Sequence, residues 1–321
     1  MNSILIIGKG SSEYMSKEIK KIDTVEEAML LYGEESQLVE AFKEAFEAGA
    51  KNIYLCNAYK YSDHLLIINS LINKEFSYIA PLFDFSDKFT SNDGKEFYLC
   101  EMYSSMIDNV GAIILTSSHA RYYEDVQQFA DDMNVKVSDF KIARSENLVN
   151  SENLCFVVNN LKNNKYANVI LASILSLSDF KTYPKADIDN VYFDLNFNDF
   201  FGNECIFFTH NPLTGLNVNN LVNFLTKDDP KKFIPNNIIS NIISKMLSMN
   251  EFEGSLFNAH KKIMIENKIS NVISDISGTL VENAKLAYFD TIIESGCVTI
   301  SSKILVKPYM YSEYFEITMG S

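Results

Sequence analysis

The sequence ends with KILVKPYMYSEYFEITMGS, residues 303–321, and this stretch predicts a strand, a break and a second strand. Residues 304–306 and 314–319 are rich in β-branched and aromatic side chains, which is typical of strands. Pro308 lies between them and lacks the N–H group that a strand ladder needs, so the two segments cannot form one continuous strand. We therefore expect the last part of the chain to be β-structure.

The final strand alternates between two kinds of side chain. One face holds Phe315, Ile317 and Met319, and the other holds Tyr314, Glu316 and Thr318. This is the pattern of a strand with one buried face. Such a strand pairs either within its own sheet or with the exposed edge of a neighbouring chain, and the pattern alone leaves both pairings open.

The composition is that of an acidic globular protein. At 321 residues the chain exceeds what one hydrophobic core usually serves, so two domains are expected. The 42 Asp and Glu residues outnumber the 28 Lys and Arg residues, and the resulting net charge of -14 repels nucleic acid and anionic membranes. The sequence shows neither the basic start of a signal peptide nor a long apolar span, so no membrane insertion is expected.

The cysteines give no sign of a disulfide framework. There are five, an odd number, and they lie far apart in apolar stretches: Cys56, Cys100, Cys155, Cys205 and Cys297. Buried reduced thiols are the expected state, and they indicate a cytosolic origin.

Strands and helices alternate over about the first 200 residues. Residues 4–7 form a buried strand, Asp23 or Thr24 caps a first helix, Ser36 caps a second, and residues 52–56 form the next strand. Further strands are expected at 78–85, 112–115, 154–158 and 205–209, and further helices at 64–72, 98–109, 124–133 and 167–177. This alternation indicates an α/β fold.

The pattern changes after residue 205. Two helices are expected at 236–249 and 255–268, and β-structure follows Gly296. We therefore expect an α/β N-terminal domain with alternating strands and helices, residues 1–204. An α+β C-terminal domain ending in β-strands, residues 205–321, should follow it.

Motifs for catalysis or metal binding are weak. Gly8-Lys-Gly10-Ser-Ser-Glu follows a strand and begins like a dinucleotide-binding fingerprint, but the third glycine is missing and no P-loop lysine follows. Ser117 and Ser118 lack the Gly-x-Ser-x-Gly elbow that presents a nucleophile. We therefore expect no active site and no cofactor.

The remaining polar candidates form no recognisable site either. The histidines are His64, His119, His210 and His260, and they lack the spacing of a zinc site. His119 and His210 both follow expected strands and could approach each other, although a surface or hydrogen-bonded role is the favoured explanation. No Asp-x-Asp spacing for calcium occurs among the loop aspartates, which are Asp84, Asp87, Asp93 and Asp108.

Several short segments occur in an order that a known family shares. They are IKKIDTVEEAMLLYG (residues 19–33), QL (37–38), AFEAGAKNIY (45–54), FSYIAP (76–81), TGLNVN (214–219), LT (225–226), ILVKP (304–308) and SEYFEIT (312–318). The early segments give a short helix ending in an aromatic residue and a glycine, a second helix with small residues, and a strand. The last two give a strand, a proline and a final strand. In this order the sequence resembles the contractile tail sheath proteins of phages and contractile injection systems.

The resemblance implies a structural protein without enzymatic activity or cofactor. Its partners would be further copies of itself in a helical stack of rings, an inner tail tube protein, and baseplate and neck proteins. The subunit would contract without hydrolysing a nucleotide, driving the tube through the target envelope. It would be assembled in the bacterial host cytoplasm and would reside in a virion tail or an injection particle.

The resemblance also implies candidate contact residues. Residues 314–319 would link subunits by joining a neighbour's sheet. Lys261, Lys262 and Lys268, on one expected helix of an otherwise acidic protein, would face the tube, although a solvated helix face explains them equally.

One feature departs from the family pattern. Sheath proteins commonly carry an N-terminal extension before the first core strand, whereas residue 4 already begins that strand here. The chain would then link neighbours through its C-terminus alone, or serve as a sheath-like neck or baseplate component. The remaining alternative is a nucleotide-binding α/β enzyme that uses Gly8 and Gly10.

Overall fold

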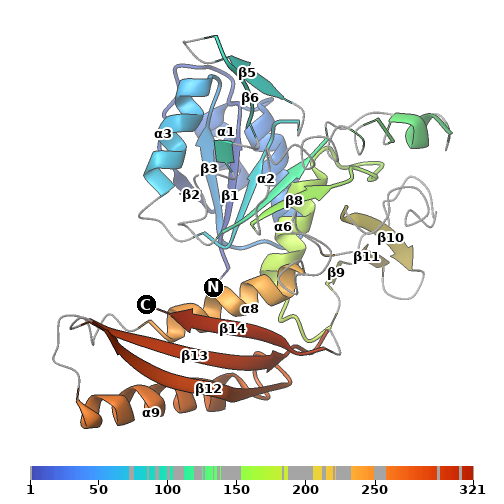
Figure 1. Ribbon diagram of the computed structural model, residues 1–321. Helices are drawn as coiled ribbons and strands as arrows, with labels where there is room; N and C mark the ends of the chain where they lie inside the picture. Colours follow the sequence, from blue (N-terminus) through green and yellow to red (C-terminus); the bar gives the residue numbers. More distant parts are fainter. Residues whose placement is uncertain are drawn as a thin grey trace. The chain divides into compact units, whose positions relative to one another are not determined.

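The computed structural model of the chain divides into two compact units (Figure 1). Unit 1 comprises Met1–Ser178 and Pro184–Lys227, and unit 2 comprises Asp179–Tyr183 and Asp228–Ser321. The structure describes residues 2–71, 76–84, 87–90, 94–99, 102–103, 112–118, 125, 127–132, 134–135, 138, 153–182, 184–186, 205–211, 215–219, 221, 233–248, 258–294, 297–310 and 313–320.

Unit 1 is built on a six-stranded sheet with the order β2-β3-β1-β4-β7-β8. The strands are β1 (Ile4–Gly8), β2 (Lys20–Ile22), β3 (Ile53–Asn57), β4 (Tyr78–Pro81), β7 (Ile113–Ser117) and β8 (Leu154–Val157). All neighbours are parallel except β2, which runs antiparallel to β3 at the edge. In chain order the five parallel strands therefore read 2-1-3-4-5 across the sheet, one of the common orders of doubly wound α/β folds.

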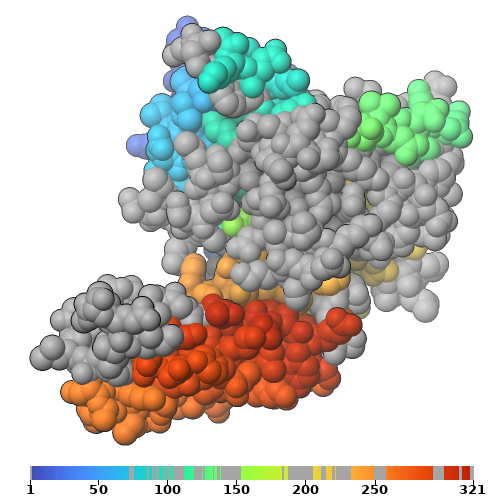
Figure 2. Space-filling view, in the orientation of Figure 1, coloured from blue at the N-terminus to red at the C-terminus, as the bar shows by residue number. Residues whose placement is uncertain are grey.

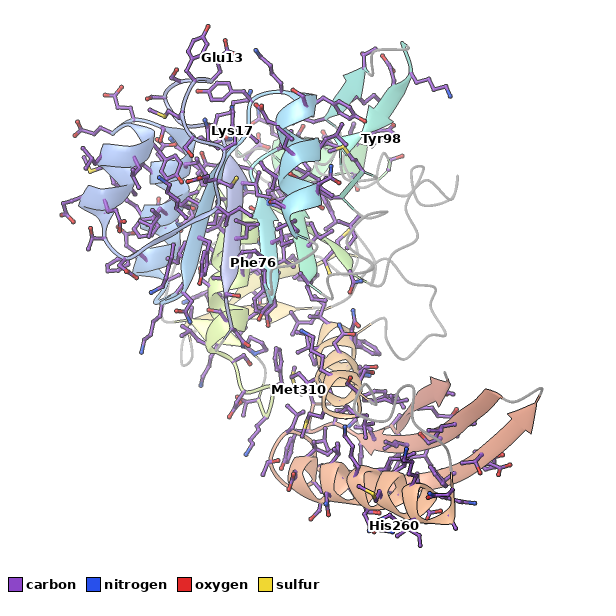
Figure 3. The ribbon with its side chains drawn as sticks, turned by 90° about the vertical axis from the view of Figure 1, so that its left-hand side faces the viewer. Glu13, Lys17, Phe76, Tyr98, His260 and Met310 are labelled. Carbon is purple, nitrogen blue, oxygen red and sulfur yellow. The ribbon has the colours of Figure 1, made fainter. Side chains whose placement is uncertain are left out.

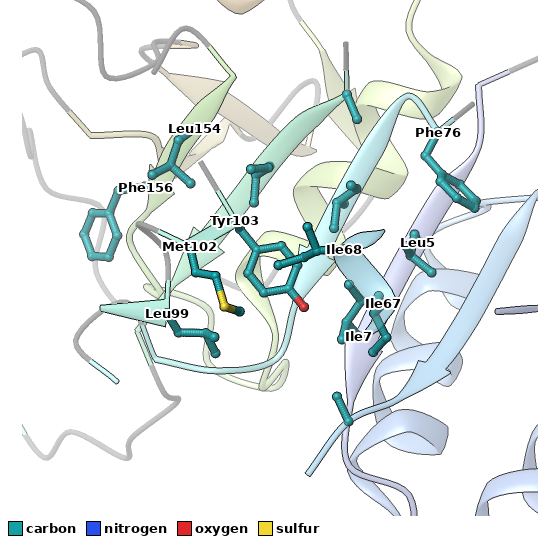
Figure 4. Packing of buried hydrophobic residues seen from close by; sticks show 14 of the residues in the cluster. Leu5, Ile7, Ile67, Ile68, Phe76, Leu99, Met102, Tyr103, Leu154 and Phe156 are labelled. Atoms are coloured by element: carbon teal, nitrogen blue, oxygen red, sulfur yellow. The ribbon is translucent and has the colours of Figure 1, made fainter. Parts of the chain in front are cut away.

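Helices cover both faces of this sheet. They are α1 (Val25–Tyr32), α2 (Gln37–Glu47), α3 (Tyr61–Leu71) and α6 (Ala167–Leu177). Leu5 and Ile7 of β1 pack with Ile67 and Ile68 of α3 in one hydrophobic core (Figure 4). The other face is covered by α2 and α6, which contact each other as well as β1. Burial of each such side chain contributes roughly 1.5–3 kcal/mol, so this layering accounts for most of the stability of the unit.

The expected helix caps are present. The Thr24 hydroxyl accepts the N–H of Glu27 at 3.1 Å and begins α1, and the Ser36 hydroxyl accepts the N–H of Val39 at 3.3 Å and begins α2. Gly33 ends α1 with a φ of 87°, a conformation that glycine adopts without steric cost. The sequence does not predict β2, because three residues are too short to show an alternation.

Two smaller sheets also occur among the described residues of unit 1. One is a ribbon of β5 (Lys88–Thr90) and β6 (Glu96–Tyr98), and the other has the order β10-β11-β9, with β9 (Lys185–Ala186), β10 (Phe207–Asn211) and β11 (Gly215–Asn219). The main chain of Ile206 exchanges hydrogen bonds with Phe156 and Val158, at 2.9 and 2.8 Å. This pairing explains why residues 205–227, which the sequence analysis placed in the second domain, are part of unit 1.

In its described residues, unit 2 contains two helices and a three-stranded antiparallel sheet of order β12-β13-β14. The elements are α8 (Ile234–Met246), α9 (Ala259–Ile276), β12 (Asn283–Glu294), β13 (Cys297–Lys307) and β14 (Phe315–Gly320). Its core joins an apolar stripe of α9 to the inward side chains of the sheet, Ile304 and Val306 among them. Part of this sheet is visible at the surface (Figure 2), and its exposed side chains include Leu286 and Tyr288 of β12.

The chain thus has mixed helices and strands with a parallel and an antiparallel sheet, compatible with an α/β fold. Strand β12 was not expected, since the sequence analysis began the β-structure after Gly296. Helix α9 ends at Ile276 rather than at residue 268, because Ile269, Val272 and Ile276 continue its buried stripe. Residues 127–132 are helical, as expected for the helix at 124–133. Most of the helix expected at 98–109 lies outside the described residues, and its first residue ends strand β6 instead.

None of the helices that the structure describes is both long enough and apolar enough to cross a membrane.

Candidate functional site

Strand β14 carries the candidate subunit-linking residues. It pairs antiparallel with β13, so that Phe315 lies opposite Val306 and Ile317 opposite Ile304. The side chains of Phe315 and Ile317 are only 1% and 3% exposed, whereas Glu316 and Thr318 are exposed. The alternation expected for this strand is therefore present, although Tyr314 precedes the strand and the Met319 side chain lies outside the description.

Of the two pairings that the sequence leaves open, the chain adopts the internal one. Phe315 and Ile317 complete the core of unit 2, together with Ile269 and Val272 of α9. The strand that the family resemblance assigned to a neighbour's sheet thus lies in its own sheet, because the inward side of β13 is apolar at the matching positions. A link between subunits through residues 314–319 remains a prediction.

Strand β14 is nevertheless an edge strand. It is the outermost strand of the β12-β13-β14 sheet, and among the described residues it pairs with β13 alone. Its outward side chains add an ion pair of 2.7 Å between Lys303 and Glu316 and a hydrogen bond of 3.2 Å from Asn283 to the Tyr314 hydroxyl. An edge of this kind can accept a further strand.

The three candidate tube-facing lysines all lie on α9. Lys261 donates its main-chain N–H to the capping side chain of Asn258 at 2.9 Å. The Lys262 ammonium group lies 5.8 Å from the ring centre of Phe289 on β12, and the Lys268 ammonium group donates to the main-chain carbonyl of Ser248. Two of the three therefore have partners within unit 2, and contact with a tube remains a prediction for all of them.

The glycine loop after β1 has its main-chain N–H groups occupied. The N–H of Lys9 donates to Gln37 Oε1 at 3.0 Å, that of Gly10 to Asn57 Oδ1 at 2.8 Å, and that of Ser11 to the carbonyl of Tyr32 at 2.7 Å. A phosphate cradle needs such groups unbonded. The loop, which continues to Lys17 (Figure 3), therefore lacks the geometry of a dinucleotide-binding turn.

Packing also leaves little space for a side chain at Gly8 and Gly10. A Cβ atom on Gly8 would lie 2.6 Å from Leu82 Cδ1, and one on Gly10 would lie 2.9 Å from Met15 Sδ. Sequence reasoning missed Asn57, the fully buried residue whose amide also donates to Ser12 and Met15 and holds the loop in shape. Its polar side chain at the end of an apolar strand was the available signal.

The histidine, serine and cysteine candidates take structural places. His64 is 5% exposed, and its Nδ1 lies 2.8 Å from the Tyr103 hydroxyl. Burial lowers the pKa of His64 to about 4. The Ser117 hydroxyl donates to the carbonyl of Val157 at 2.8 Å. Among the described residues, Cys56, Cys155 and Cys205 are buried thiols that form no disulfide.

Two further expectations can be examined only in part. His119 lies outside the described residues, so the approach of His119 to His210 remains a prediction. Among the residues that are described, no group of three or more His, Cys, Asp or Glu side chains could hold a metal ion.

Comparison of the sequence with protein-family models and with curated proteins gives no match. Solved structures do match the fold. A sheath tail protein from Desulfitobacterium hafniense gives a TM-score of 0.63 at 10% identity over 100% of this chain and 96% of that one. The contracted helical sheath of the anti-feeding prophage gives 0.63 at 12% identity over 98% and 91%.

A third similar structure comes from the anti-feeding prophage baseplate, with a TM-score of 0.61 at 13% identity over 99% of this chain and 88% of that one. At such identities the likeness concerns the fold, and it extends over nearly the whole of each chain. The chain therefore has the fold of contractile tail sheath proteins, as its sequence resemblance predicted.

Proposed function

We propose that this protein is a structural subunit of a contractile tail sheath, which polymerises helically around an inner tube and contracts to drive it through a target envelope. The observation that carries the proposal is the likeness to sheath structures over 98–100% of this chain and 91–96% of theirs. A match of that extent leaves little of either chain for a different fold.

A role without catalysis accords with the candidate nucleotide loop. Its main-chain N–H groups are bonded within the chain, and its glycines lie close to the side chains of Leu82 and Met15. Contraction would then draw on rearranged contacts between subunits rather than on hydrolysis by the subunit itself.

The proposed partners are other copies of this chain, an inner tube protein, and baseplate and neck proteins. The net charge of -14 supports protein partners over nucleic acid. The open edge of β14 is the proposed place for a strand from a neighbouring subunit. The assembled protein would reside in a virion tail or injection particle built in the host cytoplasm.

A baseplate component is the second candidate. The match to a chain of the anti-feeding prophage baseplate, over 99% of this chain and 88% of that one, favours it specifically. A baseplate component would form single rings of fixed size, whereas a sheath subunit would stack rings into a tube.

Electron microscopy of the purified protein tests the proposal. We expect rings that extend into striated tubes when the inner tube protein of the same particle is added. Single rings that never lengthen would favour the baseplate role. Protein that stays monomeric both alone and with the tube protein would contradict both roles.

A further inference from the structure

A pocket at the carboxyl end of the unit 1 sheet is unused by the proposed sheath function. Strand β1 lies between β3 and β4 in the sheet. The chain runs from β1 to β3 on one side and then crosses to β4 on the other side of β1. In doubly wound sheets, ligands bind in the crevice at such a point, beyond the carboxyl ends of the strands. Lys9, Ala58 and Leu82, which directly follow β1, β3 and β4, line this pocket together with Tyr59.

The volume of the pocket favours a small organic ligand. It measures about 360 Å³, within the range of about 300–1,000 Å³ that small-molecule sites occupy. A neighbouring pocket beside Ser118 and Lys165 measures only about 170 Å³. It also lies beside Glu44, whose carboxylate already accepts the N–H groups of Lys165 and Tyr166. Of the two, the pocket beside Lys9 is therefore the better candidate.

Hydrogen bonds fix the walls of this pocket in advance. Gln37 accepts the N–H of Lys9 at 3.0 Å and donates to the carbonyl of Leu82 at 2.9 Å, which joins two sides of the crevice. The Tyr59 hydroxyl donates to the carbonyl of Gly10. A site formed before binding loses less conformational freedom when its ligand arrives.

The charged groups favour an anion. The charged residues among those described in the lining are Lys9, Asp87 and Lys88. The Lys9 ammonium group makes no ion pair with any described residue. It lies over the Tyr59 ring, 6.0 Å from the ring centre. The Asp87 carboxylate, which keeps its charge, accepts the N–H of Asp84 at 2.9 Å, and Lys88 forms an ion pair of 3.8 Å with Glu96. Lys9 is therefore the lysine of the lining that is left to meet an anion. His64 is neutral at pH 7 because burial lowers its pKa to about 4.

Apart from Gln37 and His64, the uncharged part of the lining is apolar or aromatic, including Ile7, Leu82, Phe83 and Leu99. Because the N–H groups of the glycine loop are bonded, the site offers side-chain charge but no main-chain cradle for a phosphate chain. From the crevice, its volume and the ammonium group of Lys9, we propose that this pocket binds a small organic carboxylate with an apolar body. The Lys9 ammonium group would hold the carboxylate.

Calorimetric titration of the purified full chain with phenylacetate tests the proposal. We expect saturable binding, weakened about tenfold or more in Lys9→Gln, as the loss of a charge-assisted hydrogen bond predicts. Lys51→Gln is the matched control, because exposed Lys51 precedes β3 at the opposite end of the sheet. Its affinity should equal that of the unchanged protein.

Absence of saturable binding at millimolar phenylacetate would overturn the proposal, as would equal weakening by Lys51→Gln. Preferential binding of inorganic phosphate or ATP would overturn the assigned ligand class. Thermal melts of both variants show whether the fold is retained. The titration measures ligand binding and does not depend on assembly. A protein that binds no phenylacetate could therefore still be a sheath subunit, and a protein that forms no rings could still bind the carboxylate.

Discussion

At the scale of single residues, His64 should make the stability of the fold depend on pH. Its ring is buried against Tyr103 and Phe83, and burial is the main cause of its lowered pKa. Nearby Lys9 and Lys17 lower it further, and Asp63 opposes them. Since the folded pKa of about 4 lies below the ordinary value of 6.5, the unfolded chain takes up a proton first as pH falls.

Neutral His64 should therefore leave the free energy of unfolding undiminished above pH 6.5. As pH falls from 6.5 toward 4, that free energy should decrease. Protonation at its full extent would lower the free energy of unfolding by about 3 kcal/mol. Urea unfolding at a series of pH values should show this loss in the unchanged protein and in His260→Gln, an exposed control. The loss of stability should be much smaller in His64→Gln. Identical pH profiles for His64→Gln and His260→Gln would contradict this account.

At the scale of elements, β14 is required for the fold of unit 2. Ile317 is buried against the same core as Ile304 and Ile269. Ile317→Ala should therefore lower the free energy of unfolding by about 2–5 kcal/mol, because it leaves a cavity. Thr318→Ala, on the exposed side of the same strand, should change it by less than about 1 kcal/mol. Chemical unfolding of unit 2, followed by hydrogen exchange, measures both changes.

Removing residues 312–321 separates the two roles of the strand. Because β14 completes its own core, we expect unit 2 to lose protected amides while unit 1 remains folded. A truncated chain whose unit 2 remains fully protected but no longer assembles would instead identify β14 as a detachable arm.

At the scale of the whole molecule, the net charge of -14 opposes contact between identical subunits. If copies of the chain assemble, salt should promote the assembly, because the Debye length falls from about 30 Å at 0.01 M to about 8 Å at 0.15 M. Light scattering at constant protein concentration measures this. Assembly that weakens steadily over that range would point instead to an interface held by ion pairs, such as one formed by Lys261 and its neighbours.

The sequence by itself determined most local features. The capping side chains of Thr24 and Ser36, the glycine after α1 and the alternation around Phe315 depend on neighbours close in sequence, so their patterns could be read directly. The order of short segments likewise predicted the sheath fold that the solved structures share.

Only the tertiary structure decided which partners those elements take. The alternation of apolar side chains in β14 is compatible with pairing to any edge strand that has an apolar face. Its pairing with β13 follows from complementary faces that folding brings together. Residues 205–227 belong to unit 1 because Ile206 continues the edge of β8, a long-range pairing that no local pattern marks. Gly8 and Gly10 resemble a phosphate loop in sequence, yet Gln37 and Asn57, distant along the chain, occupy the N–H groups that such a loop would use.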